Sequence, residues 1–385
     1  MAQRRLTIPE RGIRLLIALL LLQTWAVDGI LVPCQIDGGS MADTLRGTHR
    51  DVVCGDCGCR FACQRDPLDD EPRVACPNCG HVEKSVAGQI DLAGDRVLID
   101  RSAYCFRAPR RWEIAAFRHP AYPGAILVKR VIGLPEESIE IRHGDIYVDG
   151  QIQRKTLAQQ HALAVLVYDA SYQPKLKPTP PPRWHGESAE SRWQCRSGRF
   201  ERSLANENPD GPPPVVLPVE NEKIDWLVYE HWRRAGGTGG VVYTPVTDLC
   251  AYSPRPRREG DVQAVPDLLL SFRVMETYGR GELILWATDG REEFEVRIQP
   301  AAMHYEVLHG GRPVSGGRGR LPVSLAGTTV EISLFDQQFI LALDGRTVVV
   351  WPYDRPLPPP TPPAQPLAIG CRHLGVVLQE LRVYR

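Results

Sequence analysis

The chain has 385 residues, of which 43% are hydrophobic and 24% are charged, and its 46 basic residues balance its 46 acidic residues. This length allows two or three domains, each with a core of its own. Zero net charge argues against a nucleic-acid-binding protein, which normally carries a basic excess. The ordinary charged fraction excludes a chain that is disordered throughout.

An apolar segment near the N-terminus, Ile13–Val27, is interrupted only by Arg14 and Gln23. Arginines occur at positions 4, 5, 11 and 14, at or before the start of this segment, and no other basic residue occurs before Arg46. The positive-inside rule therefore predicts a cytoplasmic N-terminus and an exported remainder. We expect a retained signal anchor over residues 1–32 that crosses the lipid bilayer of the cell (inner) membrane once. A cleaved signal peptide is the alternative, because a spanning helix needs about 20 apolar residues.

The segment Asp37–Leu45, which follows the anchor, contains the first candidate site residue, Ser40. Two glycines before this serine leave it accessible from one side, because glycine adopts backbone conformations that other residues avoid. The serine and Asp43, three residues later, also fit the capping box that begins a helix. Taken alone, the segment predicts a helix cap.

The second candidate, Lys129, lies in the apolar and β-branched stretch Ala125–Pro135, which predicts a buried strand that ends in a turn. A charged lysine is costly to bury. The amine therefore either reaches solvent from a sheet edge or is held neutral. A neutral lysine beside a serine is a working pair of general base and nucleophile.

Together the two stretches resemble the type I signal peptidase family, which are membrane-bound serine proteases with a Ser–Lys dyad. Residues 38–45, GGSMADTL, correspond to the family motif S-G-S-M-x-P-T-L. Residues 129–135, KRVIGLP, match the lysine motif, and GDIYVDG follows at 144–150. Residues 94–100 and 112–120 look like the intervening strand motifs. The resemblance implies a mainly β fold with a signal-peptidase-like β core over residues 33–47 and 89–158.

The resemblance also implies a function. Ser40 would be the nucleophile and Lys129 the general base in removing signal peptides from exported preproteins, with no cofactor for catalysis. Two features depart from the family. Gly38 stands where many members carry a serine that completes the oxyanion hole, and the last motif, G-D-N-x-x-x-S-x-D-S-R, is absent. The alternative is therefore a degenerate or truncated member that acts as a membrane-tethered binding protein.

Two cysteine pairs predict a zinc ribbon inserted over residues 48–88. Cys54 and Cys57 form one C-x2-C pair, Cys76 and Cys79 form the other, and 18 residues separate the pairs. This spacing is typical of a structural zinc site with four thiolates. A glycine follows each pair, as a tight turn around the metal requires. A set of disulfides is the alternative, because the exported side of the membrane is oxidising.

The remaining chain divides into two segments. Residues 159–262 are rich in proline and predict a linker or a loosely packed segment. Its four tryptophans, at 184, 193, 226 and 232, argue against disorder, so we expect them to pack on a neighbouring domain. Residues 263–385 alternate between apolar and polar side chains, which predicts an antiparallel β-sandwich. The expected strands cover residues 268–274, 281–286, 293–298, 329–334, 338–343, 347–351 and 376–383. The pattern resembles a concanavalin-like jelly roll, as in laminin-G-type domains, which implies a carbohydrate or protein ligand.

Overall fold

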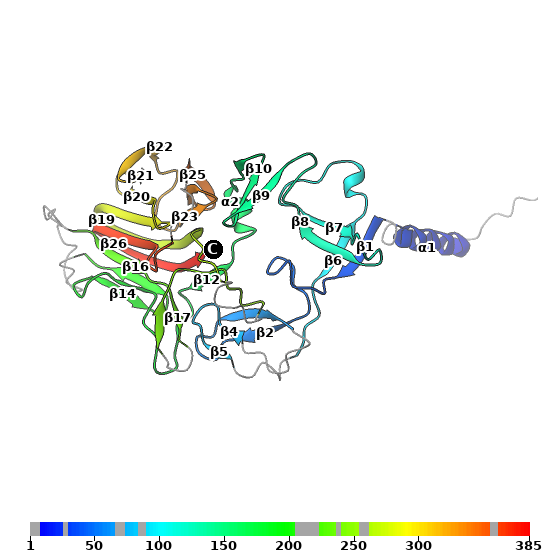
Figure 1. Ribbon diagram of the computed structural model, residues 1–385, viewed down its shortest axis with the longest axis horizontal. Helices are drawn as coiled ribbons and strands as arrows, with labels where there is room; N and C mark the ends of the chain where they lie inside the picture. Colours follow the sequence, from blue (N-terminus) through cyan, green and yellow to red (C-terminus); the bar gives the residue numbers. More distant parts are fainter. Residues whose placement is uncertain are drawn as a thin grey trace, which may run out of the picture. The chain divides into compact units, whose positions relative to one another are not determined.

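The computed structural model describes residues 8–25, 30–65, 74–83, 90–204, 223–235, 240–253, 262–354 and 361–385. Strands greatly outnumber helices, so the predicted mainly β class is confirmed (Figure 1). The chain divides into two compact units. The first unit comprises Met1–Arg50, Gln64–Pro67 and Gln89–Ile139, and the second comprises Asp51–Cys63, Leu68–Gly88 and Glu140–Arg385.

Helix α1, Ile8–Trp25, contains most of the predicted membrane anchor. Glu10 and Arg14 fall within its 18 residues and shorten the uninterrupted apolar run. Among the helices described, none has both the length and the apolarity needed to cross a membrane. The predicted transmembrane helix is therefore not found.

The first unit contains two antiparallel ribbons. Strand β1, Leu31–Gln35, pairs with β6, Arg96–Asp100, and β7, Ile114–Arg118, pairs with β8, Ile126–Arg130. A short 3-10 helix, Ala103–Cys105, follows β6. The prediction that the Lys129 strand is buried was wrong, because Lys129 is exposed and its strand neighbours are at most half-buried. The physical reason is that β7 is the one strand paired with β8 in the described part of the chain.

The cysteine pairs lie in the turns of two hairpins. Strands β2, His49–Val53, and β3, Arg60–Gln64, flank the first pair, and β4, Val74–Ala75, and β5, Val82–Glu83, flank the second. Val52, Cys63 and Val74 form a small buried cluster between the hairpins. The apolar part of the ribbon is therefore small, which leaves the cysteines themselves to supply most of its interior.

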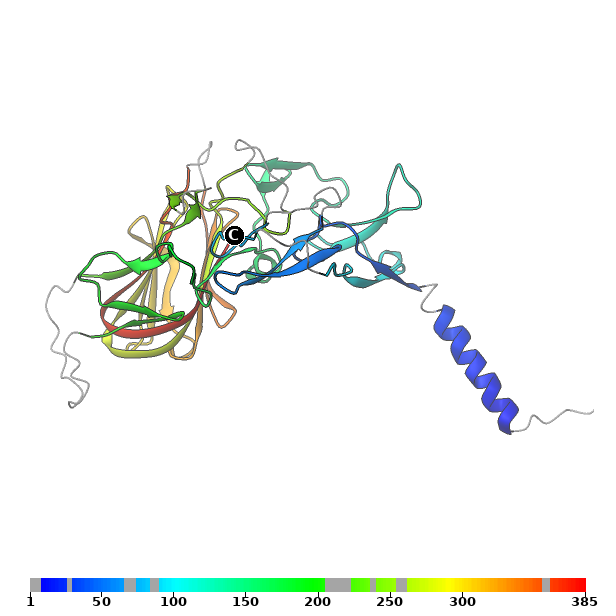
Figure 2. The same cartoon turned by 90° about the horizontal axis from the view of Figure 1, so that it is seen from below.

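The second unit is built around two long antiparallel strands, β19, Leu268–Thr288, and β26, Leu367–Tyr384. Figure 2 shows the yellow β19 and the red β26 curving together, and three register shifts interrupt their pairing. The predicted strands 268–274 and 281–286 are thus parts of one continuous strand. Further strands complete the antiparallel sheet, namely β20 Glu293–Gln299, β21 His304–His309, β22 Arg312–Arg320, β23 Thr329–Phe335, β24 Gln338–Leu343 and β25 Arg346–Pro352.

The structure differs from the prediction of a loose linker over residues 159–262. This part of the chain follows helix α2, Leu157–His161, and a three-stranded sheet of β9 Ile139–Arg142, β10 Asp145–Val148 and β11 Gln151–Ile152. It then forms five strands that extend the main sheet, each paired with β26 or with a strand that pairs with β26. These are β12 Leu166–Asp169, β13 Trp184–Gly186, β14 Trp193–Arg196, β15 Arg199–Arg202 and β16 Asp225–Tyr229, with β17 Trp232–Arg234 and β18 Val241–Tyr243 as a separate ribbon. Trp184 and Trp193 enter the main core, as expected of these tryptophans. Such short strands carry too few residues to show the alternation that identifies a strand.

Candidate active site and metal centre

A closed loop, residues 37–47, carries Ser40. The loop is closed by the Thr48 amide, which donates to the Asp37 carbonyl at 3.2 Å. Two hydrogen bonds also tie Arg46 to Asp95: the Asp95 amide donates to the Arg46 carbonyl at 2.9 Å, and the Arg46 amide donates to the Asp95 carboxylate at 2.8 Å. Gly47 is required for this closure, since a β-carbon there would lie 2.1 Å from the Asp37 carbonyl oxygen. Gly94 is required for the same reason, because a β-carbon on it would lie 1.8 Å from the Ile36 carbonyl oxygen.

Within this loop, residues 40–44 form a turn and not the regular helix that a capping box would begin. The amide of Leu45 donates to the carbonyl of Met41, and the side chain of Met41 is buried. The Ser40 side chain is exposed beside it. The turn therefore buries the side chain of Met41 and leaves the hydroxyl of Ser40 exposed to solvent.

Lys129 is positioned by the pairing of β7 with β8. Ala115 lies directly opposite Lys129 in the register. The next residue, Arg130, donates through Nη1 to the Trp112 carbonyl at 2.8 Å and through Nη2 to the Thr44 hydroxyl at 3.2 Å. Arg130 thus connects the lysine strand to the serine loop.

The turn after β8 is held by Glu137. Its carboxylate accepts hydrogen bonds from the Leu134 amide and from Arg111, both at 2.6 Å. Arg111 also donates to the Ile132 carbonyl at 2.5 Å. Side-chain hydrogen bonds therefore fix the lysine motif at both ends of the turn, in a region with little buried apolar surface.

Ser40 and Lys129 come together within the first unit, although 89 positions separate them in the sequence. Lys129 Nζ donates a hydrogen bond to Ser40 Oγ. Both side chains are exposed. The pair has the contact that a nucleophile and its general base require, but it lacks the enclosure that would exclude water from the amine.

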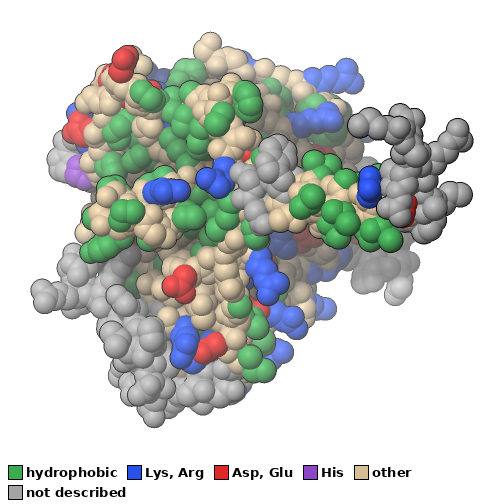
Figure 3. Space-filling view, turned by 90° about the vertical axis from the view of Figure 1, so that its right-hand side faces the viewer, with side chains coloured by type: hydrophobic (Ala, Val, Ile, Leu, Met, Phe, Trp, Pro, Cys, Tyr) green, Lys and Arg blue, Asp and Glu red, His purple; other side chains and the backbone are tan. Residues whose placement is uncertain are grey.

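The face of the ribbon that carries Lys129 is otherwise apolar. In the antiparallel register, Ala115 faces Lys129 and Phe117 faces Leu127, and side chains two apart on a strand share a face. The motif comparison alone missed Ala115, because only the strand register brings it beside the lysine. Other large apolar side chains of the first unit are also exposed, among them Ile90, Leu98, Phe106, Tyr122 and Ile126. Figure 3 shows hydrophobic side chains interspersed with Lys and Arg on one face of the molecule.

The four cysteines predicted to bind metal, Cys54, Cys57, Cys76 and Cys79, are brought together in the second unit, and all are buried. Their sulfurs lie within 4.8 Å of one another, with 3.6 Å between those of Cys54 and Cys79 and 3.7 Å between those of Cys57 and Cys76. Four sulfurs at about 2.3 Å from a tetrahedral zinc ion would be about 3.8 Å apart. The cluster therefore fits a structural zinc ion. The cysteines are free thiols in the structure.

The two cysteine turns have the same backbone hydrogen bonds. The amide of Cys54 donates to the carbonyl of residue 59, and the amide of Gly58 donates to Cys54. The second turn repeats this pattern. The amide of Cys76 donates to the carbonyl of His81 at 2.8 Å, and the amide of Gly80 donates to the carbonyl of Cys76 at 2.9 Å, the same distances as in the first turn. Both glycines have positive φ, 78° and 67°, which favours glycine over residues with a side chain.

Protons are shared unevenly among these sulfurs. Hydrogen bonds from Cys59, Cys76 and Cys79 lower the pKa of Cys57, and the hydrogen bond to the Cys57 sulfur raises the pKa of Cys76 and of Cys79. Metal binding by thiols releases their protons. Four thiolates around one ion leave no open coordination position, so such a site is structural.

The residues between the cysteines attach the ribbon to the rest of the second unit. Asp56 accepts hydrogen bonds from the amides of Lys175 and Leu176, at 2.7 and 2.8 Å, and forms an ion pair with Arg234. Arg234 also donates to the Cys79 carbonyl at 2.8 Å. The Asn78 side chain accepts from the Asp169 amide at 2.7 Å. The ribbon is thus an integral part of this unit.

A second group of potential ligands, Asp145, Asp267 and Asp336, also lies in the second unit. Lys155 Nζ donates to Asp336, and Gln337 donates to Asp145 at 2.9 Å. These carboxylates have protein partners that account for their burial.

Sequence comparisons identify relatives of one part of the chain. The family model described as signal peptidase, peptidase S26, matches residues 83–182, which include Lys129 but not Ser40. The chain is 35% identical over 65 residues to a probable signal peptidase I-1 of Synechocystis sp., with 15% of this chain and 33% of that protein covered. It is 34% identical over 58 residues to signal peptidase I V of Bacillus subtilis, with the same coverage. The chain thus spans about a third of the length of these curated relatives.

Structure comparisons give only weak similarities. A carbohydrate-binding module, CBM66 of Bacillus subtilis, is 14% identical, with a TM-score of 0.25 over 42% of this chain and 95% of that chain. The galectin LEC-6 of Caenorhabditis elegans is 12% identical, with a TM-score of 0.23 over 30% of this chain and 81% of that one. The comparisons as a whole support a relationship to signal peptidases that is confined to the region around Lys129.

Proposed function

We propose that this protein is a signal-peptidase-like serine endopeptidase that cleaves exported preproteins. The observation that carries the proposal is the contact between Ser40 Oγ and Lys129 Nζ. The family match covers the lysine and stops short of the serine, so the contact is support independent of that match.

In the proposed mechanism, neutral Lys129 accepts the proton of the Ser40 hydroxyl as Oγ attacks the scissile carbonyl carbon. The tetrahedral intermediate collapses when Lys129 returns this proton to the leaving amine. Water, deprotonated by Lys129, then attacks the ester on Ser40, and Lys129 returns the proton to Ser40 Oγ as the new carboxyl terminus is released. The Ser40 amide would contribute to the oxyanion hole.

Lys129 must lose its proton before it can act as a base. Exclusion of water disfavours the charged form of an amine. Because Lys129 is exposed, we propose that the substrate itself supplies this cover by lying along the apolar face that contains Ala115, Phe117 and Leu127. A preprotein segment with small side chains at the scissile bond would fit beside Ala115.

We also propose that the chain acts on the exported side of the inner membrane and associates with the lipid bilayer through residues 1–32. The arginines before Leu15 and the exposed leucines of α1 support this location. Fractionation of cells that express the full chain tests it, since recovery of the chain with the membranes is expected and recovery only with unattached proteins contradicts it.

Cleavage of a model preprotein by the full chain tests the proposed reaction. Ser40→Ala and Lys129→Met should each abolish cleavage, and the double variant should be no worse than either, because the residues act as a unit. Ser188→Ala and Lys223→Met are matched controls at exposed positions of the second unit, whereas the dyad lies in the first. Equal cleavage by the parent and the Ser40→Ala variant overturns the proposal.

A second candidate is a non-catalytic binding protein that retains the protease scaffold. The exposure of both dyad side chains favours it. This candidate predicts that neither the parent nor the variants cleave, while the parent still binds a preprotein.

A further inference from the structure

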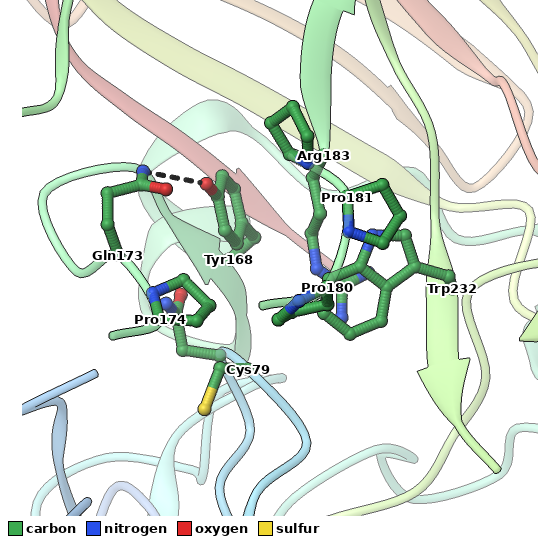
Figure 4. Close-up of a pocket in the computed structure, with 10 residues that line it drawn as sticks. Cys79, Tyr168, Gln173, Pro174, Pro180, Pro181, Arg183 and Trp232 are labelled. Carbon is green, nitrogen blue, oxygen red and sulfur yellow. Dashed lines mark hydrogen bonds between the residues drawn. The ribbon is translucent and has the colours of Figure 1, made fainter. Parts of the chain in front are cut away.

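A cavity in the second unit borders the cysteine cluster, because Asn78 and Cys79 form part of its lining. It has a volume of about 410 Å³, including its open mouth. Its walls are largely apolar and are formed by Tyr168, Trp232 and the prolines at 174, 180, 181 and 182. Figure 4 shows the side chain of Arg183 extending toward the space between Pro180 and Trp232.

Arg183 is a buried cation in this cavity wall, with 3% of its surface exposed. Its guanidinium carbon lies 4.0 Å from the centre of the Trp232 ring and 5.6 Å from that of Tyr168. Aromatic rings stabilise a positive charge. They supply no oxygen acceptor for the five N–H donors of a guanidinium.

The hydrogen bonding of Arg183 is incomplete. Its Nη1 bonds to Nδ1 of His231 at 2.9 Å, whereas its Nε and the indole Nε1 of Trp232 are buried without a partner. In the regions that the structure describes, no carboxylate pairs with Arg183. His231 is neutral, because burial and the nearby Arg183 lower its pKa to about 2, so it offers a hydrogen-bond acceptor but no charge. A buried cation without a counter-ion is strongly unfavourable.

We propose that the cavity binds a small organic carboxylate. The carboxylate would accept hydrogen bonds from the Arg183 guanidinium, which matches it in shape and charge. The apolar body of the ligand would contact Tyr168, Trp232 and the prolines. The carboxylate can belong to a free acid or to the C-terminal residue of a peptide, and the two sources share this recognition chemistry.

Calorimetric titration of the full chain with matched acids and amides tests the proposal. Benzoate should bind at least about tenfold more tightly than the neutral benzamide, because hydrogen bonds between charged groups are lost in the amide. N-acetylphenylalanine and its amide test the peptide source in the same way. Tighter binding of the acetylated amino acid than of benzoate assigns a peptide terminus, and the reverse assigns a free acid. Equal binding of acids and amides overturns the proposal, as does no binding at about 10 mM of either acid.

Two variants test the site itself. Arg183→Gln should weaken benzoate binding at least about tenfold, whereas Arg199→Gln, at a half-buried arginine of β15 that pairs with Glu201, should leave it unchanged. Pro180→Phe fills the cavity without altering Arg183 and serves if Arg183→Gln does not fold. Benzoate binding of parental strength in either folded cavity variant contradicts the assignment.

Discussion

Ala115 and Lys129 face each other across the β7–β8 ribbon. This pairing places the smallest side chain with a β-carbon directly beside the amine that contacts Ser40. Phe117 and Leu127 extend the same face. The ribbon therefore provides room for a substrate at the lysine and apolar contacts beyond it.

Enlarging Ala115 should block this space. We expect Ala115→Phe to reduce preprotein cleavage at least about tenfold, because a displacement of the substrate by about 1 Å can cost far more than that in rate. Ala116→Phe is the matched control, since Ala116 points to the opposite face of the ribbon. Cleavage rates of the two folded variants provide the measurement. Equal losses in both would exclude a role for the face itself.

Restoring a serine at position 38 should improve catalysis. A β-carbon at Gly38 meets no atom within 4 Å, so the structure accommodates Gly38→Ser. By the resemblance to signal peptidases, its hydroxyl would add an oxyanion donor, and one such donor is worth up to about 10²–10³ in kcat. The rate of the variant relative to the parent is the readout, with Gly38→Ala as control. A rate no higher than that of Gly38→Ala would show that position 38 does not contact the oxyanion.

Metal removal should destabilise the second unit. The purified chain should contain about one zinc ion, and a chelator should lower the free energy of unfolding by several kcal/mol. Zinc binding contributes roughly 10–16 kcal/mol in isolated zinc-finger peptides. The loss should be smaller here because other contacts already hold the cysteine turns. Cys57→Ser should lose the metal, whereas the exposed Cys195→Ser should retain it. Zinc analysis and denaturant unfolding test this. Destabilisation by a reductant but not by a chelator would indicate disulfides instead.

Loss of the Asp56 carboxylate should separate the ribbon from the second unit. Asp56→Ala leaves Arg234 and two amides without their acceptor, and breaking a buried ion pair costs about 3–5 kcal/mol. Asp51→Ala, at an exposed position of the same ribbon, is the control and should cost less than about 1 kcal/mol. Unfolding free energies measured in denaturant give both values.

The contribution of Asp56 should also depend on pH. Burial alone would raise its pKa, but hydrogen bonds from the Leu176 and Lys175 amides and the charge of Arg234 lower it overall below the ordinary value. A lowered pKa in the folded state means that the stabilisation is present above the unfolded-state pKa, about 3.9, and is lost as the pH falls through the folded-state value. The difference in unfolding free energy between parent and Asp56→Ala should therefore shrink in acid. A difference independent of pH would contradict this.

Local motifs predicted the parts of the site that depend on short segments. The cysteine spacing predicted which four sulfurs meet, because the glycines fix each turn locally. The motifs around Ser40 and Lys129 predicted their proximity. They predicted a buried strand around Lys129 and left open whether its amine reaches solvent, because burial depends on how many strands and layers cover β8.

Long-range packing explains what the sequence could not reveal. Strand β15, Arg199–Arg202, lies in the segment expected to be a linker, yet it pairs with β26 from the end of the chain. Likewise, Asp56 contacts Arg234, which is 178 residues away. Neither partner can be inferred from local periodicity, because both contacts depend on the course of the chain between them.

The most direct test of the account is the rate at which the full chain cleaves a model preprotein, compared with the rate of its Ser40→Ala variant. Product identification by mass spectrometry locates the cleaved bond. The account predicts a single cleavage site and a loss of at least about 10³-fold in the variant. Retained cleavage by Ser40→Ala, or no cleavage by a folded parent chain, would contradict it.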